Sequence, residues 1–120
     1  MKVRSRIPQK RAKPRRGPMR DVGYRQWCCE QPCVVSGIKG DTWIVSGSGL
    51  WRRAIIDPAH TQNNGMGSKG PDSSCVPLER AYHREYDAGR KAFEKRYVVN
   101  MKQLAEEHYA RYQSTQERRD

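Results

Sequence analysis

The sequence predicts a small α+β domain with a basic arm ahead of it. The chain has 120 residues, which fits one domain and excludes multidomain assemblies and large cofactor folds. Short β-branched and aromatic segments, separated by glycines, occupy its middle, and helix-forming residues dominate from residue 78 onward. Only 35% of the residues are hydrophobic, so we expect a small core with trailing ends.

The first twenty residues carry most of the net charge of +11. They hold nine of the 24 Lys and Arg residues and no acid, so the other hundred residues have 15 basic and 13 acidic side chains, a balance of +2. We expect this arm to be disordered and to contact the phosphates of DNA or RNA, although such an arm can also serve as a solubility tag, an address or a tether. The expected contacts are Lys10, Arg11, Lys13, Arg15, Arg16 and Arg20.

Residues 1–20 contain no apolar stretch suited to a secretory signal, and no apolar run approaches the roughly 20 residues that cross a bilayer. We therefore expect a cytoplasmic protein that does not associate with membranes. The sequence leaves the oligomeric state open.

The first half of the expected domain is a helix followed by strands. Residues 21–30 predict a short helix with Tyr24 and Trp27 on one face. Residues 43–45 and 51–56 read as the two strands of a hairpin, and IIDPAH as a strand that ends at His60. The polar run from 61 to 74 predicts a surface loop, and residues 75–77 a short extended segment.

Helices are expected in the second half. Residues 78–87 predict a helix that ends near Gly89, followed by a further turn or two that carries Phe93. Asn100 and Gln103 resemble a capping box at the start of a last, amphipathic helix ending near Gln113. The expected organisation is an arm at 1–20, a domain at 21–113 and a frayed tail at 114–120.

Two of the three histidines flank the polar loop. His60 ends the strand before it, and His83 lies in the helix after it, four residues before Asp87. On a helix this spacing places the imidazole and the carboxylate on one face, where they can hold one divalent cation. A strand with a histidine, a loop, a second strand and a helix with two ligands is the order of parts in a ββα-metal nuclease finger.

The run AHTQNNGMGSKGPDSSCVPLERAYHREYDAGRKAFEKRY resembles the HNH endonuclease-like proteins of phages and prophages, including relatives of the phage recombination enhancement nuclease. The family typically reads AH, a glycine-rich stretch with GMG and K, a D, VPLC, HH and a third H, then GRxxFE. The resemblance extends from about Tyr24, where YRQW and QPCVVSG are similar to the family's opening, to about Tyr109. It implies a metal-dependent DNA endonuclease or nickase, encoded by a phage or prophage, that acts in the cytoplasm of a bacterial host.

Roles follow from this resemblance position by position. His60 matches the family's general base and His83 its helix metal ligand. Asp87 stands where the family usually has a third histidine, which suits Mg²⁺ or Mn²⁺ at least as well as Zn²⁺. Asp57 is a candidate additional ligand. Asp87 can equally be a helix acid that pairs with a neighbouring basic side chain.

Other roles are assigned less directly. The family's asparagine, which orients the base, has no clear equivalent, and Asp72 is the first candidate, with Ser74, Asn63 and Asn64 behind it. Lys69 is expected to contact a phosphate or simply to be solvated. His108 shares the apolar face of the last helix, so we expect a packed core histidine.

The family's structural zinc site is incomplete here. Its four ligand positions read Cys33, Ser36, Glu79 and Tyr82, so three of the usual ligands are missing. Two interpretations stay open. A rebuilt metal site would use Cys28 or Cys29 with Cys33 and Cys75, or the cysteines are buried thiols, with Cys33 and Cys75 near each other.

Two other functions compete with a nuclease. The missing ligands fit an accessory protein for recombination or packaging that keeps the fold and binds nucleic acid without cleaving it. A more remote class is an interaction protein, such as an inhibitor of a host factor.

Overall fold

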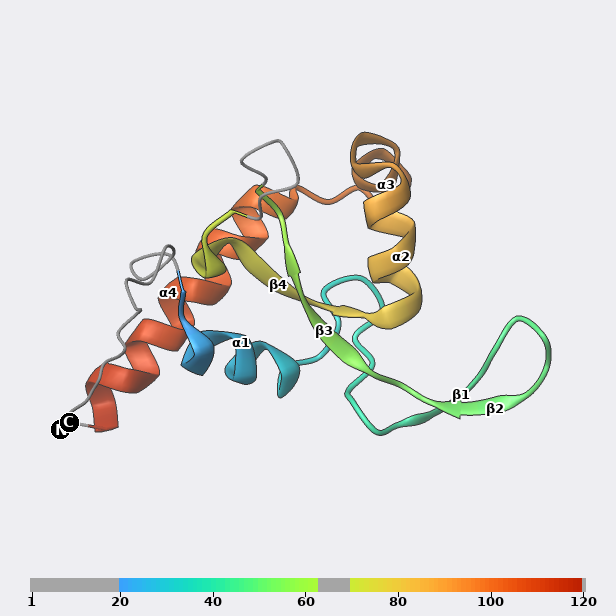
Figure 1. The fold of residues 1–120 in the computed structure, drawn as a ribbon, viewed down its shortest axis with the longest axis horizontal. Helices are drawn as coiled ribbons and strands as arrows, with labels where there is room; N and C mark the ends of the chain where they lie inside the picture. The colour runs from blue at the N-terminus through green and yellow to red at the C-terminus, as the bar shows by residue number, and fades with distance from the viewer. Residues whose placement is uncertain (1–19, 63–69, 120) are drawn as a thin grey trace, which may run out of the picture.

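The computed structural model describes residues 20–62 and 70–119, and within them the predicted α+β class is confirmed. Four α-helices and two antiparallel two-stranded sheets make up this part of the chain (Figure 1). In chain order the elements are α1 (Val22–Cys29), β1 (Trp43–Val45), β2 (Trp51–Arg53), β3 (Ile56–His60), the 3-10 helix η3 (Asp72–Ser74), β4 (Cys75–Glu79), α2 (Arg80–Ala88), α3 (Arg90–Tyr97) and α4 (Met101–Arg119).

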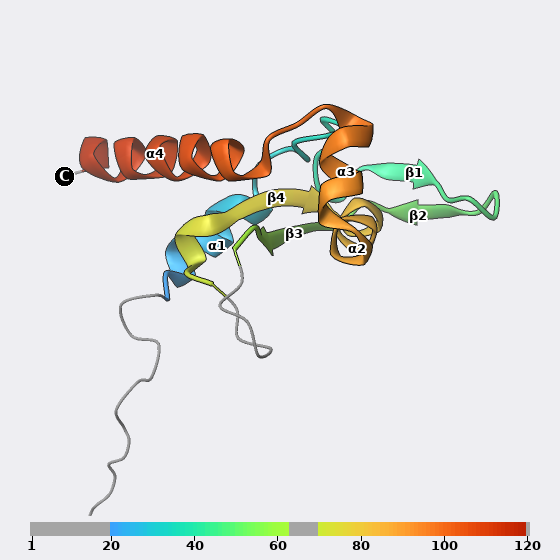
Figure 2. The same cartoon turned by 90° about the horizontal axis from the view of Figure 1, so that it is seen from above.

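The sheet of β3 and β4 lies at the centre of the molecule. Its strands pair from Ile56 with Glu79 to His60 with Cys75, so the loop that joins them begins at a histidine and returns at a cysteine. Helices α1 and α2 pack against both strands, and α4 packs against β4, η3 and α1 (Figure 2). Every residue of β4 is buried, because helices cover it along its length.

Two apolar clusters hold these elements together. The larger joins the central sheet to α2, α3 and the start of α4, through Leu78, Phe93 and Met101 among others. The smaller joins α1 to the first residue of β4 and to α4, and consists of Tyr24, Cys28 and Cys75, with Trp27, Tyr109 and Tyr112 around it. Burial of such side chains contributes roughly 1.5–3 kcal/mol each, so a small domain depends on both clusters.

Strand β4 is longer than predicted, and α2 begins two residues later than the sequence suggested. Leu78 stays in the strand because it pairs with Asp57 and is fully buried. Glu79 then caps α2, since its carboxylate accepts a hydrogen bond from the N–H of Ala81 at 3.2 Å. Gly89 ends α2 as predicted.

Helix α4 continues through the segment that was expected to fray, and ends at Arg119 instead of Gln113. No glycine or proline interrupts residues 114–119, and Thr115 and Gln116 both bond to Tyr112, one turn back. At the other end, the side chain of Asn100 accepts a hydrogen bond from the N–H of Gln103 at 3.1 Å, which confirms the predicted cap. His108 is buried on the inner face of α4 and bonds to the carbonyl of Leu104, so the expected core role is confirmed.

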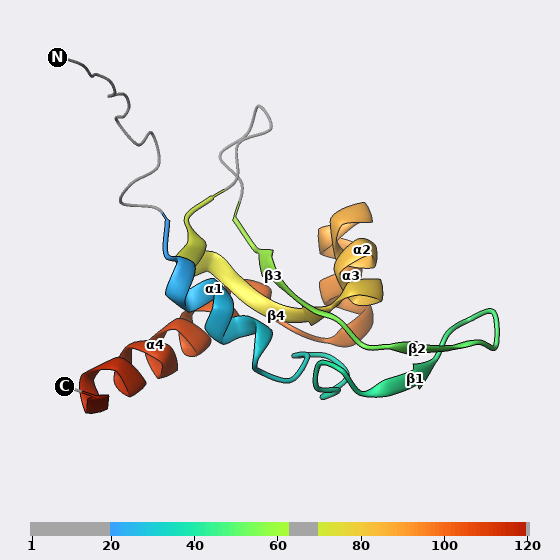
Figure 3. The same ribbon diagram turned by 60° about the horizontal axis from the view of Figure 1, so that its bottom comes forward.

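The predicted hairpin of β1 and β2 is confirmed, but its second strand stops early. β2 ends at Arg53, the N–H of Ala54 still bonds to the carbonyl of Thr42 at 2.7 Å, and the chain enters the other sheet at Ile56. Gly49 supplies the positive φ of 86° that the hairpin turn requires. The hairpin extends from the end of the molecule opposite the C-terminal end of α4 (Figure 3).

An ion pair between a partly exposed arginine and a buried glutamate fastens this hairpin to the central sheet. Arg52 of β2 donates two hydrogen bonds, of 2.8 and 2.9 Å, to the carboxylate of Glu79, which is 1% exposed. The bonds from Arg52 lower the pKa of Glu79 to about 2, with the N–H groups of Ile55 and Ala81 adding to the effect against the opposing effect of burial. Glu79, which the sequence resemblance aligned with a zinc-ligand position, stabilises the junction of hairpin, sheet and helix in this structure.

Residues 1–19, which include all but one cation of the predicted arm, lie outside the described part of the chain, and Arg20 is exposed. Among the described helices, none combines the length and the apolar character that a membrane span requires.

Candidate functional site: two histidine–carboxylate groups

His60 and Asp72 form the first polar group, at the end of the central sheet. His60 is the last residue of β3, and η3 places Asp72 just before β4. The Nε2 atom of His60 lies 2.9 Å from Oδ1 of Asp72, and the two side chains are 14% and 7% exposed. The sequence prediction that Asp72 stands next to His60 therefore agrees with the geometry.

The protonation of this pair follows from the surroundings of Asp72. Its second oxygen accepts the N–H of Asp21 at 2.7 Å and lies 3.9 Å from Arg25. Burial raises the pKa of Asp72, but the Asp21 N–H, His60 and Arg25 together outweigh burial and leave it below its usual value. An ionised carboxylate only accepts hydrogen bonds, so Nε2 of His60 donates to Asp72. In the neutral ring this places the lone pair on Nδ1, which is the tautomer that a general base at Nδ1 requires.

The loop between His60 and Asp72 has a closed stem. The N–H and hydroxyl of Thr61 both bond to the carbonyl of Ser74, at 3.1 and 2.8 Å, and the N–H of Gly70 bonds to the carbonyl of Gln62 at 2.9 Å. A Cβ atom at Gly70 would overlap the backbone of Gln62, so this position requires glycine. Lys69, Asn63 and Asn64 lie outside the described residues.

His83 forms the second polar group, where α2 crosses β3. Its Nδ1 atom lies 3.0 Å from Oδ2 of Asp57, and its Nε2 atom lies 3.4 Å from Oδ2 of Asp87. Arg80 donates to both oxygens of Asp57, at 3.0 and 3.3 Å. Burial raises the pKa of Asp57, but the hydrogen bonds from Arg80 and His83 lower it by more, so this carboxylate is ionised.

The three predicted metal ligands therefore do not converge on one point. The ionised Asp57 accepts a hydrogen bond from Nδ1, and Nε2 faces Asp87 on the other side of the ring. His83 is 27% exposed and Asp87 is 54% exposed, so this side of the ring is open to solvent. Asp57 orients the imidazole, and the i, i+4 pair of His83 and Asp87 that the sequence predicted faces outward.

A third arrangement was not predicted. Among the described residues, one set of three ligand-type side chains clusters closely: the ligand atoms of His60, Asp72 and Cys75 lie within 4.8 Å of one another. This is a possible metal-binding triad, with one nitrogen, one oxygen and one sulfur ligand. The three residues can be read from the sequence. The pairing of β3 with β4, which puts His60 opposite Cys75, cannot.

The cysteines are divided between the two apolar clusters. Cys33 packs in the larger cluster and Cys75 in the smaller one, beside Cys28. The expected proximity of Cys33 and Cys75 is therefore wrong, and Cys28 is the neighbour of Cys75, with its Sγ atom 4.0 Å from the Cys75 carbonyl. Burial raises the pKa of Cys28 to about 12, which makes this thiol unreactive. Cys29 is exposed.

Sequence reasoning missed the groups that fix the two histidines. The side chain of Arg25 and the backbone N–H of Asp21, the cap of α1, act on Asp72, and Arg80 acts on Asp57 from the first turn of α2. Asp21 carried a detectable signal, since it caps α1 by accepting the N–H of Tyr24 at 3.0 Å. Arg25 and Arg80 carried none, because their partners are distant in the sequence.

A scan against protein-family models, a search of curated proteins and a search of solved structures each found no match to this chain.

Proposed function

We propose that this chain is a metal-dependent DNA endonuclease or nickase of the HNH type. One observation carries the proposal: in the consecutive elements β3, β4 and α2, a histidine at the end of the first strand and a histidine on the helix are each oriented by a buried or half-buried carboxylate. A carboxylate on one ring nitrogen fixes the orientation that a general base or a metal ligand requires.

In this mechanism His60 is the general base. Asp72 holds its ring by Nε2, and Nδ1 accepts a proton from the water that attacks the phosphodiester. Asp72 also stabilises the imidazolium that forms, because it remains ionised. The pair is 14% and 7% exposed, so the positive charge develops in a largely buried setting where the carboxylate acts strongly.

The residues suited to a divalent cation are His83 and Asp87. Their Nε2 and Oδ2 atoms face each other at 3.4 Å, a spacing that suits two ligands of one ion with bonds of about 2.0–2.2 Å. When bound, the cation supplies positive charge that stabilises the negative charge on the phosphorane and on the leaving oxygen. Asp57 holds the opposite nitrogen and so fixes the tautomer that leaves Nε2 available. Nitrogen and oxygen ligands suit Mn²⁺ and Zn²⁺, and Mg²⁺ where water completes the shell.

The triad of His60, Asp72 and Cys75 suits a softer cation, because thiolate favours Zn²⁺ over Mg²⁺. A cation there would occupy the ring of His60 and compete with its role as a base. The oxygens of Asp72 already face Asp21, His60 and Arg25, which leaves little capacity for an ion. We therefore assign this group to proton transfer.

The function is tested by incubating the full chain with supercoiled plasmid. We expect conversion to the nicked or linear form with Mg²⁺ or Mn²⁺, and none in excess EDTA. His83→Ala, purified in the same way, controls for a contaminating nuclease and is expected to be at least about a hundredfold slower, because it loses a ligand. Parent and variant nicking at the same rate, or neither nicking with Mg²⁺, Mn²⁺ or Zn²⁺, contradicts the proposal. Binding without cleavage would instead favour the accessory nucleic-acid-binding function.

The position of the cation gives a second prediction. Asp87→Asn and Asp57→Asn both weaken Mn²⁺ binding, but for different reasons. Asp87→Asn removes a charged ligand. Asp57→Asn removes the partner that fixes the imidazole, with an expected loss of about 10- to 100-fold. Calorimetric titration with Mn²⁺ measures both. Glu85→Gln, on the same helix but paired with Arg96 at 2.9 Å, is the matched control and retains parental affinity.

If Asp57→Asn abolishes binding while Asp87→Asn binds Mn²⁺ like the parent, the cation lies on the strand side of His83 and the assignment is wrong. If none of the variants differs from the parent, the second group is not a metal site.

A further inference from the structure

One face of the β1–β2 hairpin exposes large apolar side chains that the fold does not use. Trp43 pairs with Arg53 across the strands, and Val45 pairs with Trp51. Residues directly opposite each other, and those two apart on one strand, project from the same side of a sheet, so these four share a face. Trp43, Val45 and Trp51 are 60%, 57% and 67% exposed. We call these four residues the tryptophan face.

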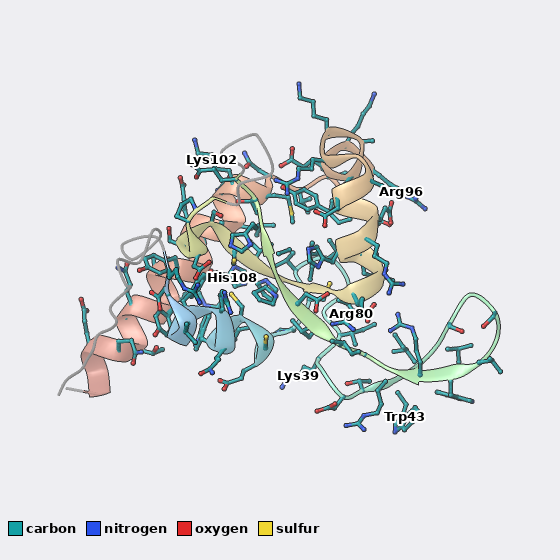
Figure 4. All side chains as sticks on the ribbon, viewed as in Figure 1. Lys39, Trp43, Arg80, Arg96, Lys102 and His108 are labelled. Carbon is teal, nitrogen blue, oxygen red and sulfur yellow. The ribbon has the colours of Figure 1, made fainter. Side chains whose placement is uncertain are left out.

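The side chains on the other face of the hairpin anchor it to the central sheet. Arg52 points to that side and makes its two bonds with Glu79, and Ile44 opposite it is half-buried. The tryptophan face is therefore not a surface left over from imperfect packing, because the hairpin is anchored without it. Clustered exposed apolar residues of this kind mark interaction surfaces. Figure 4 shows Trp43 projecting from the hairpin away from the helices.

Charge identifies the kind of partner. Arg53 lies on the tryptophan face and pairs with Asp41, but both side chains are largely exposed, so water screens this pair and a phosphate can replace the carboxylate. Arg52 is held by Glu79 on the other side of the hairpin. Lys39 lies near the base of the hairpin (Figure 4). Exposed aromatic rings next to cations are the combination that binds single-stranded nucleic acid, because bases stack on the rings while the cations meet phosphates.

The hairpin is also placed next to the proposed site. Only Ala54 and Ile55 separate β2 from β3, and Asp57, which holds His83, is the second residue of β3. A nucleic-acid strand bound at the second polar group can therefore reach the hairpin within a few nucleotides.

We propose that the tryptophan face binds unpaired bases of the nucleic-acid substrate by stacking on Trp43 and Trp51. The inference rests on the proposed function in taking a nucleic acid as the partner, and it adds a preference for single-stranded or locally opened substrate. Base-on-aromatic stacking contributes enough per ring that losing one lowers affinity by about five- to a hundredfold.

The test titrates the full chain with oligo(dT) of fifteen nucleotides in EDTA, following tryptophan fluorescence and anisotropy. The parent is expected to show quenching, because two of its three tryptophans lie on this face. Trp43→Ala/Trp51→Ala loses that quenching and binds oligo(dT) at least about tenfold more weakly, while its affinity for blunt duplex changes by less than about threefold. Trp43→Phe/Trp51→Phe keeps most of the affinity, since phenylalanine also stacks.

Val98→Asn is the matched control. Val98 is 88% exposed and lies elsewhere, and its φ of 54° suits asparagine. It is expected to bind like the parent. Unchanged oligo(dT) affinity in the double alanine variant overturns the inference, as does a parental dimer in sedimentation that this variant dissociates without any change in DNA binding.

The assay needs no cleavage, so the two proposals can fail separately. A chain that nicks plasmid but binds oligo(dT) equally well with and without the tryptophans refutes the hairpin alone. A chain that binds through the hairpin but never nicks refutes the nuclease alone.

Discussion

His60→Ala is expected to lower the rate of plasmid nicking by about 10³-fold, within the 10²–10⁴ that a general base contributes. DNA affinity stays within a few-fold of the parent, because the ring serves the attacking water and not the contact with phosphate. Single-turnover nicking and gel-shift assays on one preparation measure both quantities. A His60→Ala protein that nicks at more than about a tenth of the parental rate would exclude this residue as the base.

The variant Asp72→Asn tests whether Asp72 orients the His60 ring or only stabilises the fold. Asparagine keeps the size of the side chain, but its amide can donate to Nε2 of His60 and so favour the tautomer with the proton on Nδ1. Nicking is then expected to fall by about 10²-fold or more, and the pH dependence of the remaining activity changes because the carboxylate no longer stabilises the imidazolium. A variant that unfolds would lose activity without this change, so pH profiles and thermal melts are recorded together. An unaltered profile with normal activity would remove Asp72 from the mechanism.

Glu79→Gln is expected to lower the free energy of unfolding by about 3 kcal/mol at pH 7, because it leaves a guanidinium and two backbone N–H groups without their ionised acceptor. Urea unfolding followed by circular dichroism measures the change. Asp41→Asn is the control. Asp41 also pairs with an arginine of the hairpin, Arg53, at 2.9 Å, but the two side chains are 79% and 60% exposed, so the expected loss is below about 1 kcal/mol.

The same ion pair makes stability depend on pH. The pKa of Glu79 is lowered from a usual value near 4.5 to about 2, so below pH 4.5 the unfolded chain binds a proton that the folded chain does not. The stabilisation is complete above pH 4.5 and is lost as the pH falls toward 2. In Glu79→Gln this component is absent, so the difference between parent and variant shrinks over that range. An equal difference at pH 7 and pH 2 would show that the ionised carboxylate is not the cause.

The features that the sequence predicted correctly depend on local geometry. His83 and Asp87 share a helix face because four residues make about one turn, and the hairpin follows from glycines between β-branched and aromatic segments. The contact of His60 with Asp72 was anticipated through the family resemblance. Their catalytic roles remain predictions.

The rest depends on contacts between distant segments. The sequence predicted Glu79 as a helix residue, but in the structure it ends β4. There its carboxylate accepts hydrogen bonds from Arg52, which lies 27 positions earlier in the chain. The role of Asp57 as the partner of Nδ1 was not predicted either, because it depends on how α2 crosses β3, which no residue spacing specifies. The wrong pairing of Cys33 with Cys75 has the same origin, since only the packing of α1 brings Cys28 to Cys75.

The closed stem at Thr61, Gln62, Gly70 and Ser74 gives the loop after β3 a fixed entrance and exit. The hydrogen bonds of this stem therefore set the separation of His60 and Asp72, and that separation does not depend on the sequence of residues 63–69. Because the entropy of closing a loop grows only slowly with its length, that segment can be lengthened, shortened or exchanged at little cost in stability. The sequence between Gln62 and Gly70 can thus change while the geometry of the His60–Asp72 pair is kept.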